Sequence, residues 1–105
     1  MTFKEQILAF ISQVPRGKVV SYGQVAAVAG SPRASRQVGG ILRALPVDSK
    51  IPWWRVINNQ GILSIKGNWV VTKETQKALL EKEHVEVSPN FQVDISKYRY
   101  KKLDN

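Results

Sequence analysis

The stretch YGQVAAVAGSPRASRQVGGILRAL, residues 22–45, carries two short helical patterns on either side of a turn. Small and apolar residues predict a tightly packed helix over residues 24–29, which ends at Gly30. Residues 31–33 form a turn, and a second helix is predicted over residues 34–45. Its apolar face comprises Val38, Ile41, Leu42 and Leu45. Two helices joined in this way indicate a helix-turn-helix, although helical hairpins of other small domains show the same pattern.

Two adjacent glycines interrupt the second of these helices. Gly39 and Gly40 each cost roughly 1 kcal/mol relative to alanine in a helix interior. Such a cost indicates that another backbone approaches the helix closely. A neighbouring helix and a phosphate backbone both satisfy this expectation, and the pattern does not choose between them.

The residues before this stretch predict one more helix and a short strand. Apolar residues at helical spacing predict a helix over residues 2–13. Thr2 and Glu5 have the spacing of a capping box at its start. A turn at residues 15–18 ends this helix, and the β-branched stretch at residues 19–22 is expected to be extended.

The residues after it predict a hairpin, a final helix and a tail. Residues 55–58 and 62–66 are expected to pair as strands around the turn sequence Asn58-Asn59-Gln60-Gly61. A last helix is predicted over residues 72–83 with Thr72 as its cap, and residues 88–105 form a basic, partly mobile tail. The expected fold class is therefore mostly α with a small β element, in a winged helix-turn-helix-like single domain over residues 1–105.

The charge of the chain favours a polyanionic partner. Sixteen Lys and Arg residues against eight Asp and Glu residues give a formal net charge of +8 over 105 residues. A small domain this basic commonly binds nucleic acid, with ordinary solvated surface charge as the alternative. No long segment is both basic and strongly amphipathic, and none resembles a signal peptide, so no membrane role is expected. The expected location is the cytoplasm, or the nucleoid in a bacterium.

The composition also excludes several kinds of chemistry. The chain has no cysteine, so disulfides, thiolate catalysis and thiolate metal sites are excluded. Its one histidine, His84, does not build a metal cluster alone, and it is expected at a helix end without a catalytic task. We therefore expect no cofactor and no metal.

A second motif, IPWWRVIN at residues 51–58, places two tryptophans side by side. In a cationic protein an exposed indole offers a flat surface on which a nucleic-acid base can stack. The alternative is that both indoles pack in the hydrophobic core, as most tryptophans do.

Taken together, residues 15–26, 31–40, 51–58 and 78–83 resemble the alkyltransferase-like proteins. These are non-enzymatic relatives of the C-terminal domain of O6-alkylguanine-DNA alkyltransferase. The repair enzymes carry the motif Pro-Cys-His-Arg, in which the cysteine accepts the alkyl group and the histidine helps to deprotonate it. Here the corresponding residues are Pro52, Trp53, Trp54 and Arg55. An indole is not a nucleophile suited to alkyl transfer, so recognition without repair is what the resemblance implies.

The resemblance also implies roles for individual residues. Arg36 is the finger that enters the duplex and fills the gap left by a flipped nucleotide, with a phosphate contact or a surface salt bridge as the alternative. The lesion pocket comprises Trp53, Trp54, Tyr22 and Lys66. For Trp54 a place in the core is an equal alternative, for Lys66 a solvated charge is, and Tyr22 has the alternative of capping a helix from a buried position. The DNA backbone contacts come from Arg33, Ala34, Ser35, Gln37 and Gly39.

The remaining polar residues have supporting roles under this resemblance. Arg55 holds the motif through internal hydrogen bonds, and Asn58 forms the turn that braces the pocket. Glu83 matches a glutamate of the enzymes' hydrogen-bond relay, and it is expected to survive only as a helix-terminal polar contact. Ordinary solvated charges are expected at Arg43, Lys50, Lys73 and Lys77.

The function implied is recognition of O6-alkylguanine in double-stranded DNA by nucleotide flipping, by a monomer without catalytic residues. The family further implies that the lesion is marked for nucleotide excision repair proteins. One rival is a basic helix-turn-helix protein that binds undamaged DNA. A second rival is a hydrolytic enzyme, for which only Tyr22 and Glu83 offer an acid or base.

Overall fold

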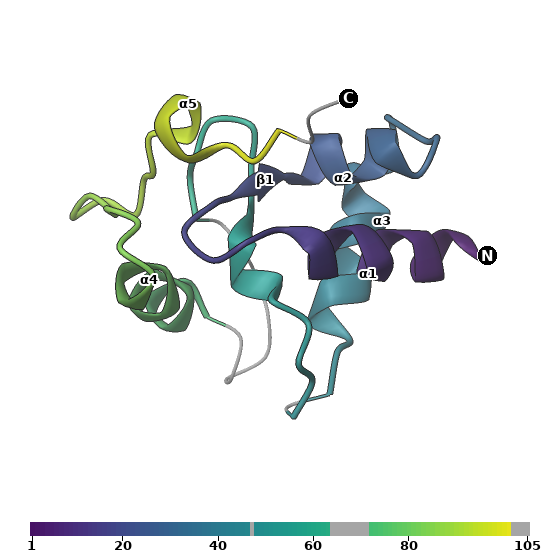
Figure 1. Cartoon of the computed structure of the whole chain (residues 1–105), viewed down its shortest axis with the longest axis horizontal. Helices are drawn as coiled ribbons and strands as arrows, with labels where there is room; N and C mark the ends of the chain where they lie inside the picture. Colours follow the sequence, from purple (N-terminus) through teal and green to yellow (C-terminus); the bar gives the residue numbers. More distant parts are fainter. Residues whose placement is uncertain (47, 64–71, 102–105) are drawn as a thin grey trace.

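The computed structural model describes residues 1–46, 48–63 and 72–101. Its elements are α1 (Phe3–Gln13), β1 (Val20–Ser21), α2 (Tyr22–Val28), α3 (Ser35–Arg43), the 3-10 helix η1 (Trp53–Arg55), β2 (Val56–Ile57), α4 (Lys73–Lys82) and α5 (Ile95–Tyr98). In Figure 1, α1, α2 and α3 lie on one side, α4 and α5 on the other, and β1 with the segment around η1 between them. The described residues therefore form a mostly helical domain with a small sheet, which confirms the predicted fold class.

The helix pair predicted from residues 22–45 is confirmed, with slightly different bounds. α2 begins earlier than expected, at Tyr22, because the hydroxyl of Ser21 accepts a hydrogen bond from the backbone of Gln24 at 3.0 Å. It ends as predicted at Gly30, whose φ of 81° is the left-handed conformation that glycine adopts without strain. α3 then runs against α2 and buries Val38 and Leu42.

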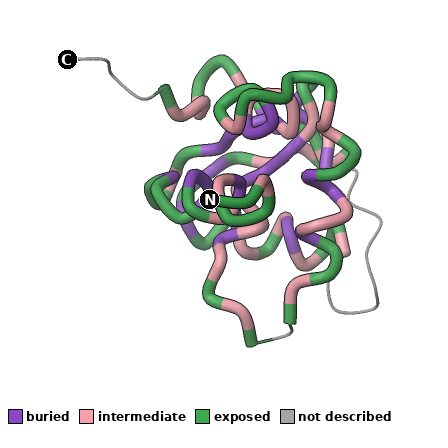
Figure 2. Tube along the Cα trace, turned by 90° about the vertical axis from the view of Figure 1, so that its right-hand side faces the viewer, coloured by how far each residue is buried: buried purple, intermediate pink, exposed green. Residues whose placement is uncertain are grey.

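The buried residues form two clusters, one on each face of the small sheet. Adjacent strand residues point to opposite faces. Val20 and Val56 are paired in register and join the first cluster, which is shared with α1, α2 and α3. Val19 and Ile57 join the second cluster, which includes Leu80 of α4. Figure 2 shows the buried stretches gathered inside a shell of exposed residues. The sheet is thus the partition between two small cores.

The predicted hairpin between residues 55–58 and 62–66 is wrong in its pairing. β2 pairs in parallel with β1, and Ile62 instead forms an antiparallel bridge with Gln92. The turn itself is present, since the Asn58 side chain accepts hydrogen bonds from two backbone N–H groups at 2.8 and 2.9 Å. β2 is buried on both faces, as parallel strands are, and such a strand does not reveal its partner locally. Residues 64–66 lie outside the described residues.

The segment expected as a tail is folded onto the domain from residue 88 to residue 101. The backbone N–H of Val19 donates to the Tyr98 carbonyl at 2.9 Å, and the backbone N–H of Tyr100 donates to the Val19 carbonyl at 2.8 Å. Val93 is buried in the second cluster, and α5 is capped by the Asp94 carboxylate. Residues 88–101 are therefore a packed part of the domain and not the mobile tail that was expected. Residues 102–105 lie outside the described part of the chain.

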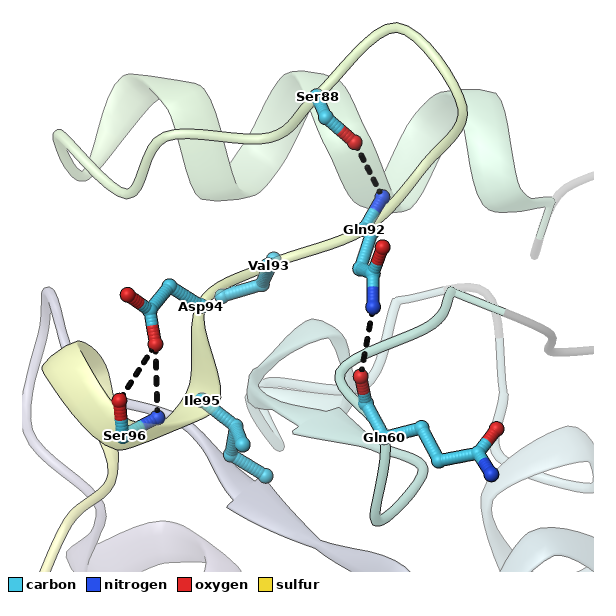
Figure 3. A pocket seen from close by; sticks show the side chains of 7 residues that line it. All are labelled: Gln60, Ser88, Gln92, Val93, Asp94, Ile95 and Ser96. Carbon is cyan, nitrogen blue, oxygen red and sulfur yellow. Dashed lines mark hydrogen bonds between the residues drawn. The ribbon is translucent and has the colours of Figure 1, made fainter.

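This segment leaves a shallow pocket of about 450 Å³ beside the turn that contains Gln60 (Figure 3). The pocket is lined by Gln60, Ser88, Gln92, Val93, Asp94, Ile95 and Ser96. Its polar groups bond to one another: the Gln92 amide donates to the Gln60 carbonyl at 3.1 Å, and Asp94 accepts from Ser96. None of these residues has a predicted site role. The pocket is therefore the boundary between the turn that contains Gln60 and the segment after α4.

α2 and α4 end in the same motif with different residue types. In each helix the two residues after the C-cap donate backbone hydrogen bonds to carbonyls of the last turn. The left-handed position is Gly30 in α2, with φ 81°, and His84 in α4, with φ 66°. His84 is therefore a helix-end residue, as expected, and it holds a conformation that is unfavourable for a side chain.

Replacing His84 with glycine should raise the free energy of unfolding by about 1 kcal/mol, because glycine adopts this conformation without a steric penalty. Gly30→Ala is the matched control and should lower it by a similar amount. No described atom lies within 4 Å of a Cβ placed on Gly30, so only backbone strain is tested there. Urea denaturation measures both changes. A His84→Gly variant that is less stable than the natural chain would contradict this account.

Candidate nucleic-acid interface

The N-terminal half of α3 presents a cationic surface. Arg33, Arg36 and Gln37 are exposed, whereas Val38 and Leu42 on the opposite face are buried. Among the described residues, no carboxylate lies within 4.0 Å of either arginine. Of the other residues predicted to contact the DNA backbone, Ala34 and Ser35 are half-buried and Gly39 is buried. The predicted backbone contacts therefore come from one helix and its preceding turn.

Gly39 lies where the side chains of Tyr22 and Arg43 meet. A Cβ placed on Gly39 would be 3.3 Å from a guanidinium nitrogen of Arg43 and 3.9 Å from the ring of Tyr22. Among the described residues, the nearest groups to Gly39 are therefore side chains and not another helix backbone, and close approach of a phosphate backbone stays a prediction. Arg43 stands one helical turn after Gly39 and is exposed, as expected for a solvated charge, while its guanidinium lies beside Gly39.

Tyr22 keeps its proton over the whole neutral range. Burial raises the pKa of its phenol to about 12, against a smaller opposite effect from the charge of Arg43. A phenol in this state is a hydrogen-bond donor, which is what contact with a phosphate oxygen requires. Its ring is half-buried against the first cluster, and the alternative role of capping α2 belongs to Ser21.

The two tryptophans of the motif diverge to the two cores. Trp53 packs against the first cluster and Trp54 against the second. Their rings meet edge to face, with centroids 6.1 Å apart and an interplanar angle of 86°. Both side chains are half-buried. Trp53 therefore shares its supporting cluster with Tyr22, and the edge of one indole fixes the plane of the other.

The side chain of Glu83 ties the motif to α4. Its carboxylate accepts hydrogen bonds from the Trp54 indole at 2.8 Å, from Arg55 at 2.7 Å and from the backbone of Gly17 at 3.2 Å. Arg55 also donates to the Val14 carbonyl at 2.8 Å. The bracing role expected for Arg55 is confirmed. Glu83 is more than the helix-terminal contact that was expected, because it joins three separate segments.

The environment of Glu83 favours its ionised form. Burial alone would raise the pKa of this carboxyl, since its side chain is only 4% exposed. The hydrogen bonds from Arg55, Trp54 and Gly17 outweigh burial and hold the pKa below its ordinary value of 4.5. Sequence reasoning missed the Trp54 contact, because the usual residue at this position is not an indole.

One predicted pocket residue, a metal site and a membrane span remain to be considered. Lys66 falls outside the described residues. Within the described part of the chain, no three His, Cys, Asp or Glu side chains come together as metal ligands. Nor, in the same residues, is any helix long and apolar enough to cross a membrane.

Comparison with known proteins agrees with the family resemblance. The profile of the family described as "6-O-methylguanine DNA methyltransferase, DNA binding domain" matches residues 2–85. The DNA base-flipping protein of Vibrio parahaemolyticus is 46% identical over 98 residues, which are 93% of this chain and 95% of that protein. Alkyltransferase-like protein 1 of Schizosaccharomyces pombe is 34% identical over 97 residues, 92% of this chain and 86% of that one.

The fold agrees as well. The crystal structure of S. pombe Atl1 in complex with damaged DNA containing O6-carboxymethylguanine matches with a TM-score of 0.88 and 31% identity, over 95% of both chains. The likeness extends over the segment after residue 85 that the family profile does not reach.

The free energy of unfolding should depend on the ionisation of Glu83. Because its folded pKa is lowered, the carboxylate stabilises the fold above about pH 4.5, and this contribution is lost as the pH falls through the folded pKa. Glu83→Gln should lower stability at pH 7 by roughly 3 kcal/mol, since it leaves Arg55 without its ionic partner. It should also flatten the acid limb of stability against pH.

Glu81→Gln is the control, because it removes an exposed carboxylate from the same helix. Chemical denaturation between pH 3 and pH 7 measures all three proteins. An acid limb equally steep in the natural chain and in Glu83→Gln would show that Glu83 does not carry this effect.

Proposed function

This chain belongs to the family of the 6-O-methylguanine DNA methyltransferase DNA-binding domain, and from that premise we propose that it recognises O6-alkylguanine in duplex DNA without repairing it. The observation that carries the proposal is the indole of Trp53 at the position of the alkyl-accepting cysteine, in a chain that has no cysteine. A relative named for DNA base flipping and another solved with damaged DNA support it.

Recognition proceeds by extrusion of the damaged nucleotide. Extrusion costs a few kcal/mol, and less for a poorly paired lesion, so a flipping protein gains selectivity from the lesion itself. Arg36 is exposed on α3 and can enter the duplex, where its planar guanidinium fills the gap and bonds to the orphaned base. Tyr22 donates to the target phosphate, and Arg33, Ser35 and Gln37 contact the flanking backbone.

The extruded base stacks against Trp53. Trp54 meets Trp53 edge to face and is held by Glu83, so it supports the pocket wall instead of contacting the base. Lys66 belongs to the rim in this proposal. A rigid indole offers its face without reorganisation, which favours stacking.

The same geometry argues against an enzymatic role. A hydrolase needs a positioned general base. Tyr22, with a pKa of about 12, stays protonated, and the Glu83 carboxylate is occupied by three donors. The protein holds the lesion and leaves the chemistry to others. By family resemblance, the monomer presents the lesion to nucleotide excision repair proteins.

Titration of one labelled duplex with and without a single O6-methylguanine tests the function. We expect the damaged duplex to bind roughly tenfold or more tightly. Log affinity should also fall with log salt by about 0.9 per phosphate neutralised. Equal affinities would favour a helix-turn-helix protein that binds undamaged DNA. Recovery of dealkylated DNA or of alkylated protein would favour an enzyme.

Arg36→Ala should weaken binding to the damaged duplex roughly 10- to 100-fold, because the gap in the duplex is then unfilled. Lys82→Ala is the charge-matched control, on α4 at the other side of the molecule (Figure 1). It should reduce affinity only slightly and equally for both duplexes. The finger role is lost if Arg36→Ala and Lys82→Ala have the same effect in this titration.

A further inference from the structure

Two residues of α4 and its C-cap, Gln76 and Glu83, form hydrogen bonds with the turn that carries the two tryptophans. Gln76 and Glu83 are seven positions apart, which is two helical turns, so they share one face of α4. Glu83 bonds to side chains of the turn, Trp54 and Arg55. Gln76 bonds to its main chain. In Figure 1 the short η1 helix lies directly beside α4.

The amide of Gln76 donates to two carbonyls on either side of Arg55. Its Nε2 lies 3.1 Å from the Trp54 oxygen and 2.9 Å from the Val56 oxygen. The residue is 1% exposed, so it does not reach solvent or DNA. Both hydrogens of the NH₂ group are thereby used on the backbone where η1 ends and β2 begins.

The other end of the same amide is not satisfied within the described part of the chain. Gln76 Oε1 is buried and has no hydrogen-bond partner there. A buried polar atom in this state is unfavourable for the fold, and a leucine or methionine at this position would avoid the penalty. One helical turn further along α4, Leu80 belongs to the apolar second cluster. The two hydrogen bonds that the Gln76 NH₂ group donates therefore explain why an amide, with its unpaired oxygen, stands at this position.

Those donors fix the shape of the turn. Carbonyls at the end of a short 3-10 helix have no partner within the helix, and buried carbonyls without donors drive the chain to rotate towards water. A rotation of the peptide groups around Arg55 would move Trp54, whose ring is in edge-to-face contact with that of Trp53. The position of the stacking surface thus depends on a residue that is remote from it in sequence.

We propose that Gln76 is a positioning residue for lesion recognition. It holds the backbone of η1 and β2 so that Trp53 is already oriented when a base is extruded. This inference rests on the proposed function, since it assigns the stacking surface to Trp53. α4 then sets the discrimination between damaged and intact DNA without contacting either.

Gln76→Met tests the proposal, because methionine keeps the size of the side chain and removes both donors. The ratio of affinities for the O6-methylguanine duplex and the intact duplex should fall about tenfold, which corresponds to ~1.4 kcal/mol. Affinity for the intact duplex should stay within about twofold, since α3 and its arginines are untouched.

Val93→Ala is the matched control. Val93 is buried in the second cluster, on the segment after α4, and takes no part in the Gln76 hydrogen bonds. Its truncation therefore loosens the core and leaves both of those hydrogen bonds in place. Both variants are compared well below their thermal midpoints. If Val93→Ala reduces the affinity ratio as much as Gln76→Met, the effect is general loosening and the proposal is overturned.

The outcomes separate this inference from the function on which it rests. A natural chain without preference for the damaged duplex overturns the proposed function itself. A natural chain with that preference, together with an unchanged ratio in Gln76→Met, overturns only the role of Gln76. Should Gln76→Met not fold, Gln76→Asn replaces it, because asparagine keeps the amide but withdraws it by one methylene group. The same loss of ratio is expected from it.

Discussion

The buried carboxylate of Glu83 is the constraint on which the rest of this structure depends. A charge taken out of water must be compensated by partners with good geometry. Glu83 finds them in the turn after α1, through Gly17, and in the motif, through Trp54 and Arg55. The donors come from segments far apart in sequence, so the carboxylate is satisfied only when these segments are correctly assembled. A tryptophan where the repair enzymes have histidine keeps a donor at this point and removes a group that titrates near neutrality.

The two-stranded sheet divides the work of the domain. One face supports α1, α2 and α3, which present Tyr22 and Arg36, and the other supports α4 and the segment after it. η1 begins where these halves meet, and its tryptophans pack one against each core. The stacking surface of Trp53 therefore rests on the same cluster as α3, whereas its neighbour Trp54 rests on the cluster of α4. The backbone of η1 joins the two tryptophans, so its conformation sets how the two halves of the domain meet at the candidate site.

The sequence predicts the elements whose signals are local. Thr2 with Glu5, Gly30 and Thr72 each mark a helix end through their own side chain or backbone, and the structure confirms all of them. The pairing of β2 was predicted wrongly, because the turn at Asn58 suggests a hairpin while the true partner lies before α2. The packed segment after residue 88 was missed for the same reason. Its partners are set by non-local contacts.

The candidate site divides in the same way. The exposed arginines on α3 and the bracing role of Arg55 follow from motif resemblance. The orientations of Trp54 and Arg43 depend on tertiary neighbours, and no pattern in the sequence predicts them.

One further consequence comes from the hydrogen bonds between Val19 and the segment around Tyr98 and Tyr100. Closing so long a loop is entropically slow. During synthesis on the ribosome, α1, α2 and α3 can assemble early, but the backbone groups of Val19 stay unpaired until residues 98–100 have emerged. Until then a chaperone has access to this open edge.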